Sequence, residues 1–145
     1  MRAVVQRVSD ASVSVNGRVV GRCGPGLMIL ACAMRGDRDA NARALARKVV
    51  SLRMFRNADG LTNRSLLDVG GAALIVSQFT LAAETSRGNR PGFSAAAALD
   101  EGKRLFDLFC ACVTAEGVAV ETGVFGAEMQ VSLVNDGPFT LMLEK

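Results

Sequence analysis

The chain has 145 residues, half of them apolar and three of them proline, so it is long enough to bury the core of one globular domain. Seventeen basic and fourteen acidic residues give a formal charge of +3, far from the strongly basic balance of a general nucleic-acid binder. The chain has no histidine, which excludes a Ser-His-Asp triad, a Cys-His pair and any imidazole acid or base.

A β-hairpin and a buried strand are predicted first along the chain. The segment "ASVSV", residues 11–15, alternates apolar and hydroxyl side chains and then meets Asn16-Gly17, the pair that best adopts the positive φ angles of a type I′ turn. After "CGPG", the apolar run Leu27–Ala33 is typical of a buried strand.

Two helices are predicted, over about residues 39–55 and 100–117. In each, apolar residues recur at helical spacing and acidic residues stand at the start, where they suit the helix dipole. The turn-rich "RNADGLTNRSLLDVGG" and a strand "AALIVSQFTLA" lie between them, and the short strands "VAVET", "MQVSLV" and "FTLML" close the chain. About seven strands and two helices indicate a single mixed α+β domain over residues 1–145.

The four cysteines, two in predicted strands and two in the second predicted helix, are interpreted as reduced, buried thiols. They lack the CxxC spacing of a structural zinc site, and Cys110 and Cys112 do not face each other on a helix. No metal site is therefore predicted.

No apolar stretch approaches the length needed to cross a bilayer. The N-terminal "MRAVVQRVSD" has charged residues where a signal peptide needs an apolar centre. We therefore expect a soluble, cytoplasmic protein without a membrane partner.

The stretch "SQFTL", residues 77–81, follows the apolar run "AALIV" and contains three polar residues. In an extended chain Gln78 and Thr80 share one face, while Ser77, Phe79 and Leu81 share the other. The polar face is either a binding surface or simply the solvated side of an edge strand.

Two further segments each have a plain and a functional interpretation. In "NDGPFT" the Gly137-Pro138 pair can expose carbonyl oxygens to a ligand, or form an ordinary tight turn. The exposed loop "ETSRGNRPGF" carries Arg87 and Arg90, which are either solvated or in contact with phosphate.

Taken together, these segments resemble the D-aminoacyl-tRNA deacylase family, also called D-tyrosyl-tRNA(Tyr) deacylases, over nearly the whole chain. The matching motifs are "MRAVVQRV", "SVSVNGRVVG", "GPGLMIL", "SLLDVGG", "VSQFTL", "RPGF", "VETGVFGAEMQV" and "LVNDGPFT". So many matches in register are far more specific than any one short motif.

The resemblance implies a barrel-like sandwich of mainly antiparallel sheets, with two helices packed on one side, that forms a homodimer. It implies an enzyme without cofactor that hydrolyses the ester of a D-amino acid, or of mischarged glycine, on the 3′ end of tRNA, and that does not bind DNA. Each active site would combine "SQFTL" of one chain with a cis Gly137-Pro138 bond of its partner. The main-chain oxygens of that pair would exclude an L side chain.

The resemblance also implies roles for individual residues. Ser77, Gln78, Phe79 and Thr80 form the catalytic segment, and the 2′-hydroxyl of the terminal adenosine assists the attack. Our own hypothesis is that N–H groups near Phe79 and Thr80 hold the oxyanion, while Gln78 and Thr80 position the substrate and ribose. Thr80 either positions the substrate or acts as a nucleophile, although no base that could activate it is evident. The predicted substrate and tRNA contacts are Arg7, Arg87, Arg90, Phe125, Met129 and Asn135.

Some of these assignments compete with simpler ones. Phe125 and Met129 suit an adenine face but also suit core packing. Arg7 is expected to brace the partner's Gly-Pro turn. Gly92 replaces the serine that many family members have in "RPGF", which puts a loop contact in doubt. A non-catalytic RNA-end binder and a small-molecule hydrolase are the rival functions.

Overall fold

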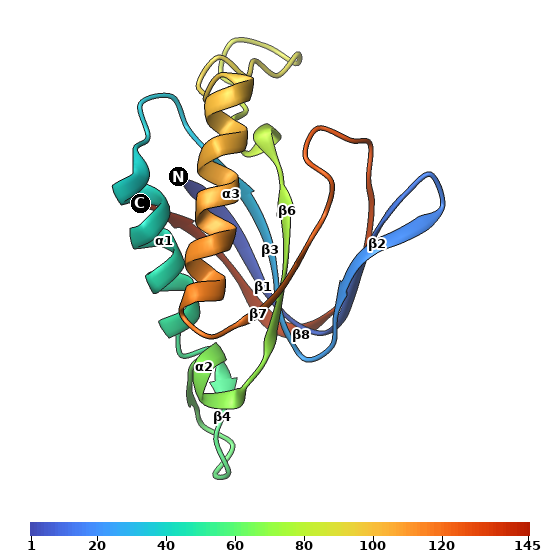
Figure 1. Ribbon diagram of the computed structural model, residues 1–145, viewed down its shortest axis with the longest axis vertical. Helices are drawn as coiled ribbons and strands as arrows, with labels where there is room; N and C mark the ends of the chain where they lie inside the picture. Colours follow the sequence, from blue (N-terminus) through green and yellow to red (C-terminus); the bar gives the residue numbers. More distant parts are fainter.

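The structure is a computed structural model that describes residues 1–145 (Figure 1). It contains eight strands, three α-helices and one 3₁₀ helix. In chain order these are β1 (Arg2–Val15), β2 (Arg18–Cys23), β3 (Gly26–Cys32), α1 (Asp39–Ser51), β4 (Phe55–Arg56), β5 (Thr62–Arg64), α2 (Leu66–Val69), β6 (Ala72–Ser77), the 3₁₀ helix η1 (Phe79–Ala82), α3 (Leu99–Ala115), β7 (Ala119–Thr122) and β8 (Gln130–Glu144).

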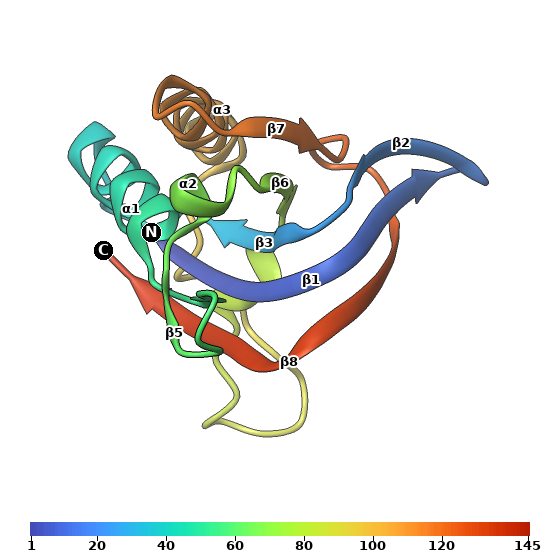
Figure 2. The same cartoon turned by 90° about the horizontal axis from the view of Figure 1, so that it is seen from below.

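Strand β1 organises the main sheet. Its first half pairs antiparallel with β3 and its second half with β2, while β8 runs antiparallel along its other edge. Strands β6 and β7 extend the sheet beyond β3 in parallel pairings. Figure 2 shows how β1 and β8 curve together beneath β3 and β6.

The sheet curls until β2 approaches β7, which gives a nearly closed barrel. The main-chain N–H of Arg22 donates a hydrogen bond of 2.7 Å to Glu121 Oε2. A Cβ atom on Gly21 would lie only 2.7 Å from the carbonyl oxygen of Thr122, so this close approach needs a glycine. The barrel-like α+β fold expected from the resemblance is confirmed.

Two apolar cores result from this curvature. The larger, of 21 buried residues, fills the space between the sheet and the helices α1 and α3, which lie on the same side (Figure 2). The smaller, of seven residues that include Met28 and Leu74, fills the inside of the barrel. Burying each large apolar side chain contributes roughly 1.5–3 kcal/mol, so the two cores provide the main driving force for folding.

Most locally coded elements form where the sequence predicts them. Asn16 and Gly17 both have positive φ angles, 50° and 76°, between β1 and β2. The second predicted helix is α3, and the strand predicted at Leu27–Ala33 is β3. The four cysteines are free and lie in β2, β3 and α3. None of the helices is both long and apolar enough to cross a membrane.

Three predictions about local structure outside the "SQFTL" segment are wrong. The first helix ends at Ser51 rather than near Phe55, which instead begins β4. The segment predicted as turns contains the β4–β5 pair and the third helix, α2. The two last predicted strands are the single strand β8, because both halves pair with β1 across the irregular segment between them.

Candidate active site

The catalytic segment predicted from "SQFTL" begins where β6 ends. The last parallel pairing joins Ala31 of β3 to Ser77, and the main-chain N–H of Gln78 then donates to the Ala31 carbonyl at 2.8 Å. Neighbouring strand β7 already ends opposite Ile75. Because no strand remains to pair with, the chain leaves the sheet at Gln78 and coils into η1. The expected strand through Leu81, with its alternating faces, is therefore wrong.

The start of η1 leaves main-chain donors free. The first intrahelical bond runs from Leu81 N–H to the Gln78 carbonyl at 3.1 Å, so the N–H groups of Phe79 and Thr80 precede the hydrogen-bonded turn. No side chain caps this end of the helix. The Gln78 side chain instead donates from Nε2 to Thr80 Oγ1, which ties the amide and the hydroxyl together as one polar unit.

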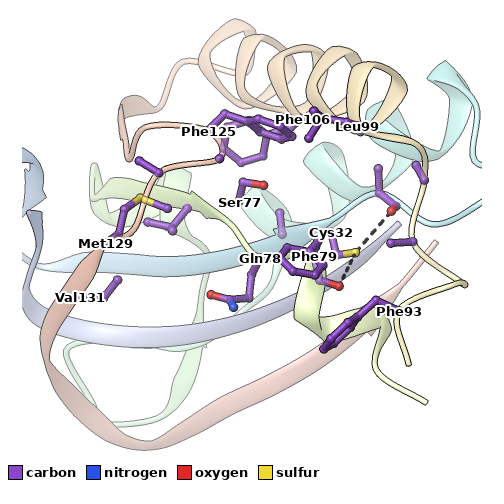
Figure 3. Close-up of a pocket in the computed structure, with 18 residues that line it drawn as sticks. Cys32, Ser77, Gln78, Phe79, Phe93, Leu99, Phe106, Phe125, Met129 and Val131 are labelled. Atoms are coloured by element: carbon purple, nitrogen blue, oxygen red, sulfur yellow. Dashed lines mark hydrogen bonds between the residues drawn. The ribbon is translucent and has the colours of Figure 1, made fainter. Parts of the chain in front are cut away.

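A cavity of about 570 Å³ opens beside this segment. Four parts of the chain line it: the ends of β3 and β6, the loop before α3, the first turns of α3, and the connection from β7 to β8. Fourteen of its eighteen lining residues are hydrophobic. Figure 3 shows the Ser77 hydroxyl between the rings of Phe106 and Phe125 above and the Gln78–Phe79 segment below.

The cavity holds almost no acid–base chemistry. Cys32 is the one lining residue with a titratable side chain, and its burial raises the pKa of the thiol above its ordinary value. The thiol lies 3.3 Å from the Ala33 carbonyl and 3.7 Å from the Phe79 carbonyl (Figure 3), so it contacts the floor of the cavity as a neutral donor. Neither a general base nor a general acid is built into these walls.

Aromatic rings form the rim and roof of the cavity. Phe79, which is 57% exposed, meets Phe93 edge to face with ring centroids 5.1 Å apart. Phe106 and Phe125 pack in a tilted pair at 5.9 Å. These faces suit a flat, apolar group such as a nucleobase.

Gly137 and Pro138 lie on the other edge of the sheet, in an irregular stretch of β8. Thr140 pairs with Gln6 and Asn135 pairs with Val8, so the four residues between them stand opposite Arg7 alone and bulge out of the ladder. The Gly137-Pro138 peptide bond is cis, as the resemblance implies. Neither residue lines the cavity of its own chain.

Arg7 holds this bulge from beneath. Its side chain is only 2% exposed, and its Nε donates to the Asp136 carbonyl at 3.1 Å and lies 2.8 Å from Asp136 Oδ2. Nη2 donates to the Gly137 carbonyl at 3.4 Å, and Nη1 to the Met54 carbonyl. The guanidinium also lies over the Phe139 ring, 4.4 Å from its centroid.

Arg7 thus braces the Gly-Pro segment of its own chain, whereas its contact with a partner's segment stays a prediction. Burial leaves its guanidinium no surface to offer to a phosphate. Asn135 is likewise engaged in the bulge. Its Nδ2 donates to the Arg7 carbonyl at 2.8 Å and to the Phe139 carbonyl at 3.2 Å.

With this geometry established, comparison with known proteins identifies the family. The sequence model of the D-Tyr-tRNA(Tyr) deacylase family matches residues 4–144. The chain belongs to that family. The recognition made from the sequence motifs is therefore confirmed, as is the prediction of an ester hydrolase at the level of the family.

Full-length relatives of this deacylase family are close. A D-aminoacyl-tRNA deacylase from Dinoroseobacter shibae is 64% identical over 99% of both chains, and one from Ruegeria pomeroyi is 59% identical over the same shares. The solved structure of a protein named c-Myc DNA Unwinding Element Binding Protein shares 34% identity with a TM-score of 0.94, covering 100% of this chain and 99% of that one. A probable eukaryotic D-amino acid tRNA deacylase shares the fold at 24% identity, with a TM-score of 0.81 over 99% and 98% of the two chains.

The deacylase fold brings together some of the predicted site residues and separates others. Ser77, Gln78, Phe79, Phe125 and Met129 all line the cavity. Phe125 and Met129 also pack against the two cores, so both of their predicted roles are compatible with their positions. Exposed Thr80 lies just outside the lining, and Arg87 and Arg90 are exposed in the loop between η1 and α3.

Five of the eighteen residues that line this deacylase cavity are predicted from the sequence, and Cys32, Phe93 and Phe106 are among those that are not. The sequence indicates Cys32 only as a buried thiol, gives no sign of Phe106, and points toward Phe93 only through the motif "RPGF". A buried thiol and a helical phenylalanine carry no local signal of a cavity, because what exposes them is the packing of a distant segment.

Proposed function

We propose that this protein hydrolyses the ester that joins a D-amino acid, or mischarged glycine, to the 3′ end of tRNA, as a cytoplasmic homodimer that proofreads charged tRNA. The observation that carries the proposal is an aromatic cavity, in a member of this family, that adjoins free main-chain donors but offers no acid or base. Such a site suits a substrate that is already activated, and an aminoacyl ester is one.

Hydrolysis in this site depends on positioning. The terminal adenine enters between the aromatic faces of Phe79 and Phe125, which brings the ester to the start of η1. The substrate's own 2′-hydroxyl assists the attacking water, since the walls hold no side chain for this task. As the carbonyl becomes tetrahedral, the N–H groups of Phe79 and Thr80 stabilise its oxyanion, and the leaving 3′-oxygen takes up a proton.

Selection between D and L acyl groups is assigned to a second copy of the chain. Gly137 and Pro138 lie outside the cavity of their own chain, so they can meet a partner's substrate; the Gly137 carbonyl accepts one bond from Arg7 and keeps a second lone pair. Strand β8 is an edge strand that pairs with β1 alone and exposes Val134 and Met142 at 59% and 75%, surface that a partner would cover. Carbonyl oxygens beside the α-carbon reject an L side chain and admit a hydrogen, as in D residues and glycine.

Thr80 acts in positioning rather than as a nucleophile. Its hydroxyl accepts a hydrogen bond from the Gln78 amide, which is no base, and no carboxylate or amine lines the cavity. We expect the Thr80→Ser variant to retain most activity and Thr80→Val to lose roughly tenfold, about the worth of one hydrogen bond to substrate. Full activity of the Val variant would eliminate both the positioning and the nucleophilic role.

The deciding experiment compares one tRNA carrying a D-amino acid, glycine or the L-amino acid in the same deacylation assay. We expect release from the first two and protection of the third. If the protein leaves every ester intact but binds these tRNAs, it is a binding protein instead. The same holds if it leaves them intact and binds DNA, which the name of the similar c-Myc DNA Unwinding Element Binding Protein says of that protein. Cleavage of simple D-amino acid esters at the same rate without tRNA would indicate a small-molecule hydrolase.

A further inference from the structure

The positive charge of the chain is concentrated in one segment. Residues 35–56 contain seven basic and two acidic residues, whereas the rest of the chain contains ten basic and twelve acidic residues. The segment, here called the basic segment, therefore carries +5, and the remainder carries −2. It consists of the turn before α1, α1 itself and the residues through the end of β4.

The cations of the basic segment are exposed and unpaired. All seven are exposed, and none takes part in an ion pair. The two acids of the segment are engaged elsewhere, Asp37 with the N-terminal ammonium at 2.9 Å and Asp39 with Arg104 at 2.8 Å. The field of the basic segment is therefore not neutralised within the fold.

Helix α3 provides the contrast. Its Lys103 pairs with Asp107 at 2.6 Å, and its Arg104 pairs with Glu101 at 2.7 Å. On α1, by comparison, Arg43 and Arg47 stand four residues apart on the exposed side, opposite the buried face, with no acid between them. Like charges at this spacing destabilise a helix by a few tenths of a kcal/mol, so this arrangement does not serve stability.

The basic segment begins at the rim of the cavity. The main-chain N–H of Arg35 donates to the Ala95 carbonyl at 2.8 Å, and the next two residues after Ala95 line the cavity. From there Arg38 precedes α1, whose 13 residues extend for roughly 20 Å. Figure 1 shows α1 at the outer edge of the helical layer, on the side away from β2, with nothing covering its outer face.

We propose that the basic segment binds the phosphate backbone of the acceptor arm of the tRNA whose 3′ end occupies the cavity. The proposal rests on the function proposed above. A polyanion that starts at the rim and extends outward meets Arg35 and Arg38 first, and then Arg43, Arg47 and Lys48 along α1. Contacts of this kind supply affinity that is independent of sequence and falls with salt, which suits an enzyme that must accept many tRNAs.

The test uses the variant R43Q/R47Q, since glutamine has nearly the helix propensity of arginine and the fold is preserved. The matched control, R18Q/R22Q, removes the same two charges from exposed positions on β2, at the far side of the molecule in Figure 1. Each protein is assayed with D-tyrosyl-tRNA and with the D-tyrosyl ester of a short 3′-terminal CCA oligonucleotide. Binding of uncharged tRNA is measured by fluorescence anisotropy.

For R43Q/R47Q we expect kcat/KM on the full tRNA to be about tenfold lower than that of the wild type at 50 mM salt. Raising the salt from 50 to 200 mM should then lower kcat/KM by a factor about tenfold smaller than for the wild type, because two phosphate contacts are lost. Affinity for uncharged tRNA falls in parallel, whereas cleavage of the short ester stays within about twofold, and R18Q/R22Q matches the wild type on both substrates.

The proposal is overturned if both variants lose the same activity, or if R43Q/R47Q loses the same activity on both substrates. It is also overturned if R43Q/R47Q binds uncharged tRNA as tightly as the wild type; an acidic protein or an anionic membrane would then be the partner to test. If the wild-type protein cleaves neither ester, it is the proposed function that fails, and the anisotropy measurement still decides whether the basic segment binds tRNA.

Discussion

Replacing Arg7 by methionine tests the claim that one buried cation holds the Gly137-Pro138 segment in place. Methionine has a similar length and fits an apolar site, but it removes every donor of the guanidinium. The carbonyl groups of Met54, Asp136 and Gly137 then lose their hydrogen bonds, and the Asp136 carboxylate loses its partner at 2.8 Å.

The expected loss of folding free energy in Arg7→Met follows from the burial of the two charged groups. Breaking a buried ion pair by removing one partner costs about 3–5 kcal/mol. The lower end applies here, because the Asp136 side chain is 54% exposed and recovers hydration, whereas Arg7 is 2% exposed. A loss of about 3 kcal/mol corresponds to a fall in melting temperature of roughly 9 °C for a chain of this size.

The control is Arg2→Met on the same strand. Arg2 is 32% exposed and its ion pair with Glu144, at 3.1 Å, is a surface pair, so the expected cost is below about 1 kcal/mol. Thermal and urea unfolding are measured for both variants at one protein concentration, since the stability of the proposed homodimer would depend on that concentration. Deacylation of D- and L-aminoacyl-tRNA then reports whether a loosened bulge loses chiral selectivity. The reasoning is refuted if Arg7→Met melts within about 2 °C of Arg2→Met, well inside the shift expected for a broken buried pair.

Three further predictions concern packing and titration. In Gly26→Ala the new Cβ would lie 1.9 Å from the Ala72 carbonyl oxygen, so we expect a loss of at least about 3 kcal/mol in urea unfolding. Burial raises the pKa of the Cys110 thiol to about 12, so it should resist iodoacetamide at about pH 8.5 until urea is added. The main-chain N–H and hydroxyl of Ser65 lower the pKa of Asp68, so Ser65→Ala should raise that pKa in an NMR titration.

Each of these three predictions has a control or a defined direction of pH dependence. Gly24→Ala meets no atom within 4 Å and should unfold like the wild type; if it is damaged as much as Gly26→Ala, the predicted clash is not the cause. The native fold holds the Cys110 proton more tightly than the unfolded chain, so stability should decline as the pH rises above about 9, and less so in Cys110→Ala. The lowered pKa of Asp68 contributes stability above about pH 4 that is lost in acid, and an unchanged pKa in Ser65→Ala would contradict the capping argument.

The sequence by itself determined the elements that depend on near neighbours. Asn16-Gly17 makes a type I′ turn because those two residues accept positive φ angles with little strain, whatever surrounds them. Helix α3 follows from Leu105, Phe109 and Val113 recurring on one face. The motifs also sufficed for the family, and hence for the cis bond before Pro138, because many matches in register are not produced by composition alone.

Only the tertiary structure decided what depends on distant partners. The chain leaves the sheet at Gln78 because β7 has already ended opposite Ile75 and the pairing with β3 ends at Ser77, which nothing in "SQFTL" signals. Arg7 is buried because β8 bulges over it, and only this packing shows that it contacts the Gly-Pro segment of its own chain. The cavity exists because segments from residue 31 to residue 131 converge, and side-chain packing between them, unlike periodicity along the chain, is not a local property.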